Sequence, residues 1–311
     1  MTQIKIRNIP WMKSRWLLFG LSMALVAASL VVIFTKGLNF GTDFTGGLKL
    51  IVKFSEPVSE NAVGEALGAS GLSNFVVQRF GETKENTFIV KSELPKDREE
   101  KFSEPYMAAL SKAFGDGKAQ LLQEEFVGPK VGKELRTKGI YAVLWAWVIM
   151  LVYIGFRFDF YYAPGALLSL IHDVVVAVGC FALFGLEVNL TVVAAILTII
   201  GYSINDTIIV MDRIRENLQR HKGMGLVENV DLSINETLSR TIITSLTVLF
   251  VVVVLFLWTE GDIKNFAFAM TIGVITGTYS SISIASPVFI FLKQHGHRFG
   301  LGKPKPAAQK A

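Results

Sequence analysis

The sequence predicts a polytopic α-helical membrane protein: six transmembrane helices, with a small α/β, ferredoxin-like extracytoplasmic domain between the first helix and the second. Composition is the first reason, because 51% of the 311 residues are hydrophobic, only 18% are charged and the mean hydropathy is +0.45. A soluble domain of this length carries more charge. The second reason is that six apolar stretches are each long enough to cross a bilayer. They are residues 16–35, 139–157, 163–186, 188–211, 240–259 and 266–292.

The first apolar stretch follows a basic leader, residues 1–15. A secretory signal has a similar leader, but its apolar core is only about 7–15 residues long, and residues 16–35 exceed that length. We therefore expect a permanent membrane anchor rather than a cleaved signal.

The insert between the first two spans, residues 36–138, holds equal numbers of acidic and basic side chains. A neutral, mixed surface suits contact with polypeptides better than contact with a polyanion. Hydrophobic periodicity predicts strands at 48–54, 75–79, 87–90 and 119–126 and helices at 59–67 and 95–114. This order of elements is that of a ferredoxin-like sandwich. Because no catalytic constellation is visible in it, we interpret the insert as a binding or gating unit.

A glycine-rich heptapeptide, GTDFTGG at residues 41–47, opens the insert. Three glycines in seven residues indicate unusual backbone angles or close contacts. A phosphate-binding loop is excluded, because no lysine stands at the Walker position and no helix follows. The favoured interpretation is a tight turn into the first strand, and a functional contact stays open.

Charge predicts the orientation. With six spans, one side of the membrane holds residues 1–15, the loop 212–239 and a basic tail at 293–311, and on this side cations outnumber anions. The short loops on the other side, around Glu187 and Glu260, are acidic. The positive-inside rule therefore places both termini in the cytoplasm. For most of these cations, topology and contact with anionic lipids explain their presence. We expect the tail to be disordered.

Charged groups at lipid depth are costly, about 2.5–3.5 kcal/mol at a helix centre, and so they indicate function. Asp206 lies deep in the fourth span, and Arg240 begins the fifth. Polar residues extend both positions into stripes at helical spacing. On the fourth span these are Thr198, Tyr202 and Asp206, with Asn205 adjacent, and on the fifth Arg240, Thr244 and Thr247.

We expect the two stripes to face each other, with Asp206 and Arg240 as an ion pair. One interpretation is a static pair that fixes the packing. The other is a proton-driven switch, since burial favours the neutral acid and a guanidinium favours the carboxylate. An acid balanced between the two can take up and release a proton, whereas arginine does not titrate. The sequence thus predicts a proton pathway through Asp206 and Arg240.

Two further features of the spans leave alternatives open. His172 and Asp173, near the middle of the third span, either extend the polar interior or form a helix-end pair that its neighbours satisfy. In the sixth span small residues recur at every fourth position, including Gly273 and Gly277. Such a face allows close helix packing. It serves either internal packing or a partner subunit.

Several classes of function are excluded by the residues that are missing. The four histidines have no metal-ligand spacing, so we expect neither a metal nor another cofactor. The single cysteine, Cys180, leaves the redox compartment undetermined. The zinc-protease helix, the serine elbow and a cysteine–histidine pairing are all missing, which argues against an enzyme. The basic balance is explained by topology, so nucleic acid is not expected as a partner.

Five motifs resemble those of the SecD/SecF family of the resistance-nodulation-division superfamily. They are GTDFTGG at 41–47, FVGPKVG at 126–132, LSLIHD at 168–173, GYSINDTIIVMDRIREN at 201–217 and ETLSRTIITS at 236–245. The resemblance covers residues 10–293. It implies that this six-span chain pairs with SecD, associates with the translocon channel SecYEG and uses the proton motive force to help emerging preproteins cross the bacterial inner membrane. It also implies that Asp206 and Arg240 conduct protons.

Two alternatives are kept. One is a half-transporter of the same superfamily that exports lipids or small amphiphiles, although the outer domain offers no clear aromatic cavity for them. The other is a scaffold without transport activity, in which neutral replacements of Asp206 and Arg240 are tolerated.

Overall fold

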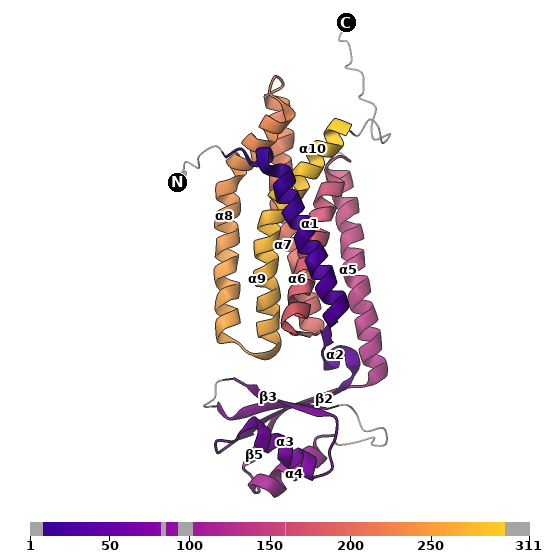
Figure 1. The fold of residues 1–311 in the computed structure, drawn as a ribbon, viewed down its shortest axis with the longest axis vertical. Coiled ribbons are helices and arrows are strands. Elements are labelled where there is room, and N and C mark those ends of the chain that lie inside the picture. Colours follow the sequence, from indigo (N-terminus) through magenta and orange to yellow (C-terminus); the bar gives the residue numbers. More distant parts are fainter. Residues whose placement is uncertain (1–8, 82–84, 93–101, 159, 296–311) are drawn as a thin grey trace.

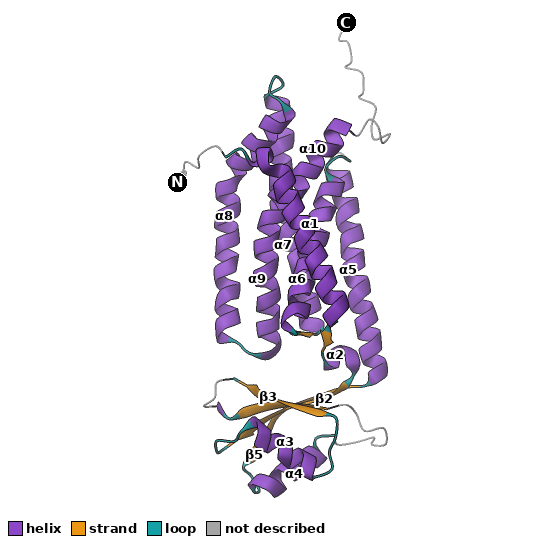
Figure 2. Cartoon of the chain, in the orientation of Figure 1, coloured by secondary structure: helices purple, strands orange, loops and turns teal. Residues whose placement is uncertain are grey.

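The protein consists of a bundle of long helices with a small α/β domain at one end, as the computed structural model shows (Figure 1, Figure 2). The structure describes residues 9–81, 85–92, 102–158 and 160–295. The α/β domain lies against one end of the bundle, which we call the domain end. The first residues of α1 and all of α10 lie at the opposite end, which we call the terminal end.

Six helical segments of the described chain are long and apolar enough to cross a membrane, as the sequence predicts. They are α1 (Arg15–Lys36), α5 (Pro129–Arg157), α6 (Ala163–Phe184), α7 (Leu190–Arg220), α8 (Leu226–Trp258) and a last span made of α9 (Gly261–Ser280), the π-helical turn η3 (Ser281–Ala285) and α10 (Ser286–His295). A short 3₁₀ turn, η1 (Trp11–Ser14), precedes α1. The predicted polytopic fold class is therefore confirmed.

Three helices, α5, α7 and α8, are longer than the apolar stretches that predict them. α5 begins at Pro129, within the segment 36–138 that was expected to belong to the outer domain. The segment 212–239, expected as a loop, is mostly helical: α7 continues to Arg220 and α8 begins at Leu226. Ion pairs tie these extensions together, since Arg213 contacts Glu216 at 2.6 Å and Glu236 at 3.0 Å. Polar residues of this kind form helix readily outside the lipid, and a hydropathy pattern does not register them.

The outer domain has the predicted ferredoxin-like topology. Its elements are β2 (Gly47–Phe54), α3 (Glu60–Ala69), β3 (Phe75–Phe80), β4 (Thr87–Ser92), α4 (Glu104–Phe114) and β5 (Ala119–Val127). The strands form one antiparallel sheet in the order β3-β4-β2-β5. The expected helix 95–114 is observed from Glu104, and most of its earlier part lies outside the described residues.

The core of the outer domain lies between the sheet and the two helices. Leu48, Leu50 and Val52 alternate along β2 and point into it, as their period of two predicts. Phe54 packs edge-on against Phe88 and Phe114. This core leaves the opposite face of the sheet turned toward the bundle.

A short connection joins the domain to the bundle. The two-residue strand β1 (Asn39–Phe40) pairs in parallel with β6 (Glu187–Val188), which lies between α6 and α7. The single-turn helix α2 (Thr42–Thr45) follows β1. The expected turn at residues 41–47 therefore includes a helical turn and lies beside the bundle.

Within the bundle, α6, α7 and α9 are central, and α1, α5 and α8 are more exposed. The central helices are the ones that carry the two embedded acids, Asp173 and Asp206. Both acids are thereby held away from lipid, as the cost of a charge in hydrocarbon requires.

Candidate functional site

Asp206 lies in a pocket of hydroxyl groups between α7, α8 and α9. Its side chain is 1% exposed. The Ser245 hydroxyl on α8 donates to the Asp206 carboxylate at 3.4 Å. Tyr202, one turn earlier on α7, donates to the Ser245 oxygen at 3.3 Å, and Thr278 on α9 lies 2.7 Å from that oxygen. Ser245 can therefore accept from Tyr202 while it donates to Asp206, which makes a short hydrogen-bonded chain. The Thr278 hydroxyl has one hydrogen, which it donates either to Ser245 or to the carbonyl of Val274, 2.8 Å away.

The expected ion pair between Asp206 and Arg240 is not formed within the described part of the chain, and this prediction of the geometry is wrong. Arg240 is exposed, whereas Thr241 and Ser245 are buried toward α7. Consecutive helical residues differ by about 100° in direction, so burial of Thr241 turns Arg240 away from Asp206.

The rest of the expected stripe on α8 is also turned away. Thr244 and Thr247 donate to carbonyl oxygens of their own helix, at 2.9 Å and 2.7 Å. On α7, Thr198 does the same at 2.8 Å and is exposed, and Asn205 is exposed as well. Of the predicted polar residues on α7, only Tyr202 is hydrogen-bonded into the pocket around Asp206.

The second embedded acid, Asp173, is fully buried on α6. One carboxylate oxygen accepts hydrogen bonds from Ser203 on α7 at 2.6 Å and from Ser280 on α9 at 2.9 Å. The other oxygen lies 2.9 Å from Nδ1 of His172. The pair lies in the middle of a span and its neighbours satisfy the carboxylate, while it also belongs to the polar interior. The two alternatives left open for it are thus both partly right.

The two glycines of the sixth span lie against α7. A Cβ atom on Gly273 would stand 2.3 Å from Cγ1 of Ile199, and one on Gly277 would stand 2.9 Å from Cβ of Ser203. Real Cβ atoms do not approach other atoms so closely, which means that α9 approaches α7 at the distance only glycine allows. Of the two alternatives, internal packing is the one observed.

Several hydroxyl residues of the site were not anticipated from the sequence. They are Ser203, Ser245, Thr278 and Ser280. A weak signal exists for one of them, since Thr241 and Ser245 are two polar residues at i and i+4. The others look like ordinary small residues of membrane helices.

The glycine-rich segment joins the domain end of α7 to that of α5. Asp43 accepts a hydrogen bond from the backbone amide of Leu190 at 3.0 Å, beside the N-cap Asn189 of α7. Gly46 has φ +75°, and a Cβ atom on it would stand 2.7 Å from Cα of Pro129 at the start of α5. Its backbone angle and its close contact both require glycine.

Two lysines on the bundle-facing side of the sheet bind acidic residues of the bundle, Asp262 of α9 and Glu187 of β6. Lys49 contacts Glu125 at 3.1 Å and Asp262, next to α9's first residue, at 3.2 Å. Burial disfavours its charge, but these two carboxylates outweigh the burial and raise the pKa of Lys49. Lys91 binds Glu187 of β6, and burial together with the positive charge of Lys49 lowers the pKa of Lys91.

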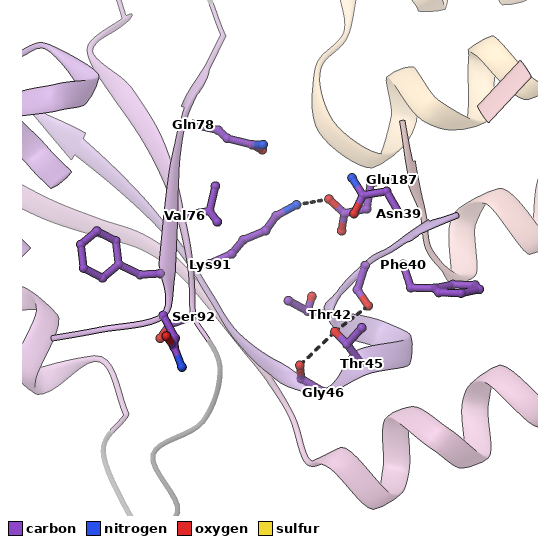
Figure 3. Close-up of a pocket in the computed structure, with 13 residues that line it drawn as sticks. Asn39, Phe40, Thr42, Thr45, Gly46, Val76, Gln78, Lys91, Ser92 and Glu187 are labelled. Carbon is purple, nitrogen blue, oxygen red and sulfur yellow. Dashed lines mark hydrogen bonds and ion pairs between the residues drawn. The ribbon is translucent and has the colours of Figure 1, made fainter. Parts of the chain in front are cut away.

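A cleft of about 560 Å³ lies beside the Lys91–Glu187 contact, between the sheet and the glycine-rich segment (Figure 3). Its lining includes Asn39, Thr42 and Gln78. The lining also includes the apolar side chains of Phe40, Phe75 and Val76, and it carries no nucleophile–base pair among the described residues. Within the part of the chain that the structure describes, no group of three or more histidine, cysteine or acidic side chains is placed to hold a metal ion.

Comparison with known proteins places these features in a family. The family model of the protein export membrane protein SecD/SecF C-terminal region matches residues 106–295, and the model of the SecD/SecF GG motif matches residues 31–58. The protein translocase subunit SecF of Desulfurispirillum indicum is 41% identical over 295 residues, 93% of each chain. That of Pseudomonas aeruginosa is 39% identical over 289 residues, again 93% of each chain.

Solved structures give the same result. The crystal structure of SecDF from Thermus thermophilus, a translocon-associated membrane protein, matches with a TM-score of 0.81 and 34% identity over 94% of this chain. This chain spans 40% of that longer chain. A second SecDF structure, in a super-membrane-facing form, matches with a TM-score of 0.71 and 33% identity. The six membrane helices, the outer domain and the glycine-rich segment are thus those of a known group, and the chain belongs to the SecD/SecF family of protein-export membrane proteins.

Proposed function

We propose that this chain is a proton-driven component of protein export, and that Asp206 is the group that takes up and releases the proton. The observation that carries the proposal is the surroundings of Asp206. It is a carboxylic acid buried at lipid depth, hydrogen-bonded to a hydroxyl and without a cation beside it in the described part of the chain. An acid in such a place has both protonation states within reach, because burial opposes its charge and hydrogen bonds support it.

Protonation changes what holds α8 to α7. The ionised Asp206 attracts the Ser245 hydroxyl, which donates to it in a long hydrogen bond of 3.4 Å. A neutral acid withdraws this attraction, and Ser245 turns toward Thr278 instead. A charge that crosses the membrane releases about 2.3 kcal/mol per 100 mV. An energy of about this size shifts the equilibrium between two positions of α8 against α7 more than tenfold.

The partner is SecD, bound to the exposed polar stripes of α7 and α8. Arg240, Asn205 and Thr198 are exposed on helices that cross the membrane. An arginine that faces hydrocarbon costs about 2.5–3.5 kcal/mol, so a covering partner stabilises this face. The matched structures support such a pair, since both are structures of SecDF and this chain spans only 40% of either chain. Arg240 acts on the proton path at this interface.

The orientation follows from charge. The terminal end carries Lys13, Arg15 and the arginines of the α7 extension, so it faces the cytoplasm, and the outer domain lies beyond the bacterial inner membrane. There the domain meets emerging preprotein delivered by the channel SecYEG. Anionic lipids contact the cations of the terminal end.

Motion of α7 is transmitted to the outer domain through the first turn of α7. Leu190 is held by Asp43 of the glycine-rich segment, and Glu187 by Lys91 of the sheet. Asn189 donates to Asp262 at 2.7 Å, and Asp262 binds Lys49. These contacts connect the helix that carries Asp206 with two strands of the outer domain.

The test is a flux and export assay in vesicles that contain the partner and the channel. Asp206→Asn is expected to assemble with SecD but to lose both proton flux and proton-dependent export. Asp212→Asn is the matched control, since it removes a half-exposed carboxylate from the same helix. Normal export by Asp206→Asn would refute the proposal. Loss of lipid or amphiphile transport with intact export would instead support a half-transporter.

A further inference from the structure

A second buried acid–base pair lies outside the Asp206 pocket and has no part in the mechanism above. His172 is 1% exposed and Asp173 is 0% exposed. Asp173 stands ten residues after the first residue of α6, a helix of 22 residues, and is therefore near the middle of the membrane. No lysine or arginine contacts it in the part of the chain that the structure describes.

The hydrogen bonds of Asp173 are those of an ionised carboxylate. Ser203 and Ser280 each carry one hydroxyl hydrogen, and both hydroxyls lie within 2.9 Å of the same carboxylate oxygen. The other oxygen faces Nδ1 of His172 at 2.9 Å. A carboxylate that accepts three hydrogen bonds is stabilised in its charged form. The proton between the two side chains therefore belongs on Nδ1 of His172.

This assignment leaves one open proton position. Nε2 of His172 is buried and has no hydrogen-bond partner among the described residues. With Nδ1 protonated, Nε2 carries a lone pair. A proton that binds there converts the imidazole to an imidazolium, directly beside the negative charge of Asp173. The pair then changes from a net charge of −1 to zero, which removes an uncompensated charge from the membrane interior.

We propose that His172 and Asp173 form a second proton-binding site, with Nε2 of His172 as the position that is loaded. The proton comes from water that reaches the bundle and returns to water on release. The inference rests on the proposed function, because it assumes that water and protons enter the bundle. It adds a proton carrier that is separate from Asp206.

The surroundings of the pair contain few other titratable groups. On α9, Tyr279 lies 6.4 Å from the His172 ring, between ring centres, and donates to the carbonyl of Leu18 on α1 at 2.8 Å. On α7 the nearest carboxylate along the helix is Asp206, three residues after Ser203. α1 contributes Ser22, which lies 3.3 Å from Ser283 of η3. The charged side chains of α5 and α10 lie toward the ends of those helices, away from the depth of Asp173.

The π-helical turn gives the site a mechanical connection. Ser280 ends α9, and η3 begins at the next residue, Ser281. π-Turns interrupt the regular hydrogen bonds of a helix and are frequent at functional sites. Protonation of the pair weakens the acceptor that holds Ser280, since Asp173 then shares its charge with the imidazolium. The proton state of His172 thereby acts on the joint between α9 and α10.

The experiment is a ¹⁵N-histidine NMR titration of the full chain assembled with its partner in lipid nanodiscs. The signal of His172 is assigned by its loss in His172→Gln, and His221→Gln, which removes an exposed histidine at the end of α7, is the control. The sample is taken from about pH 8 to about pH 5, the range in which histidine serves as a proton switch in proteins. We expect a neutral ring protonated at Nδ1 that becomes an imidazolium on acidification. In Asp173→Asn the imidazolium signal is expected to disappear at the same pH.

Asp206→Asn separates this site from the first one. Proton flux is expected to be lost in this variant while His172 still titrates. Should His172 keep one protonation state across that pH range, the second site is refuted and the role of Asp206 stands. Should His172 titrate unchanged in Asp173→Asn, the pair is not the unit that binds the proton, and the proposal fails. Ser280→Ala keeps both His172 and Asp173 and removes only one hydrogen bond to the pair. It controls for misfolding, and His172 should still titrate in this variant, with an altered midpoint.

Discussion

The carboxylate of Asp43 accepts a hydrogen bond from the backbone amide of Leu190 at 3.0 Å, so the glycine-rich segment holds the first turn of the helix that carries Asp206. The first amides of a helix have no partner within the helix and carry a partial positive charge. A carboxylate placed there satisfies an amide and complements the helix dipole. This contact thus connects the outer segment to the helix that carries Asp206 without any direct contact between Asp43 and Asp206.

Removal of this contact should weaken the start of α7. We expect Asp43→Ala to lower the free energy of unfolding by about 1 kcal/mol, a typical value for a lost helix cap. Asp43→Asn, which retains an acceptor, should lose less. The measurement is thermal unfolding of the purified chain in detergent. Asp116→Ala, in an exposed turn of the outer domain, is the control, and an equal effect there would contradict the prediction.

Substitution of two glycines in α5 should have opposite outcomes. A Cβ atom on Gly132 would stand 2.9 Å from the backbone nitrogen of Gly46, whereas one on Gly155 meets nothing within 4 Å. Gly132→Ala is therefore expected to destabilise the protein by about 1–3 kcal/mol through overpacking. Gly155→Ala should be neutral or stabilising by up to about 1 kcal/mol, since alanine favours helix. Both values come from unfolding curves in detergent.

The close approach of α9 to α7 should show itself as coupling between Gly273 and Ile199. Gly273→Ala alone forces a methyl group against the Ile199 side chain and should destabilise the protein by about 1–3 kcal/mol. Ile199→Ala makes room for that methyl group. In a double-mutant cycle, we expect the pair to be less destabilising than the sum of the singles by about 0.5–3 kcal/mol. Simple additivity would show that the two residues do not share this space.

The stabilisation that Lys49 provides through its ion pairs with Glu125 and Asp262 should depend on the charge of Lys49 and therefore on pH. Lys49→Met leaves Asp262 and Glu125 without their cation and should cost about 1 kcal/mol, a small value because both carboxylates are partly exposed. The exposed Lys53 of the same strand gives the control, Lys53→Met. Because the pKa of Lys49 is raised above its ordinary 10.5, the contribution is fully present below about pH 10.5. It is lost as the pH rises through the higher folded-state pKa.

The predicted loss of stability at high pH can be checked by unfolding the protein at several pH values. The difference in stability between the wild type and Lys49→Met should be constant from neutral pH to about pH 10 and should shrink above about pH 11. A difference that grows with pH would contradict the raised pKa of Lys49.

The hydroxyl chain at Asp206 can be tested with neighbouring residues of α8. Ser245→Ala removes the donor to Asp206, and we expect proton flux to fall about tenfold or more. Thr244→Ala removes a hydroxyl that is bonded to its own helix and should leave the flux near that of the wild type. The readout is proton flux in vesicles that contain the partner. Equal losses in the two variants would argue against a specific relay through Ser245.

Local physical chemistry accounts for the parts of the fold that were predicted correctly. The six spans follow from hydropathy, and the alternation of Leu48, Leu50 and Val52 follows from the period of a strand. Asp206 could be selected from sequence because a carboxylate in an apolar stretch is costly wherever the helix packs. The helical extensions around Arg213 and Leu226 were missed, since polar helices outside the lipid leave no mark in hydropathy.

The partners of Asp206 could not be predicted in the same way. Arg240 and Thr241 are neighbours in sequence, yet burial of Thr241 turns Arg240 outward. The sequence of one helix does not reveal how that helix is rotated about its axis, because the rotation angle is set by all the helices that pack against it. For the same reason, no local pattern distinguishes Ser203 and Ser280, which bind Asp173, from the other small polar residues of these spans.

By itself, then, the sequence determined how many times the chain crosses the membrane, the order of elements in the outer domain, and which acids stand at lipid depth. These depend on side-chain chemistry and on spacing along one chain. Only the tertiary structure decided that Asp206 faces hydroxyl groups instead of a guanidinium, and that Asp173 is shared by α7 and α9. Such pairings depend on how several helices rotate and approach one another, which is a property of their joint packing and not of any one segment.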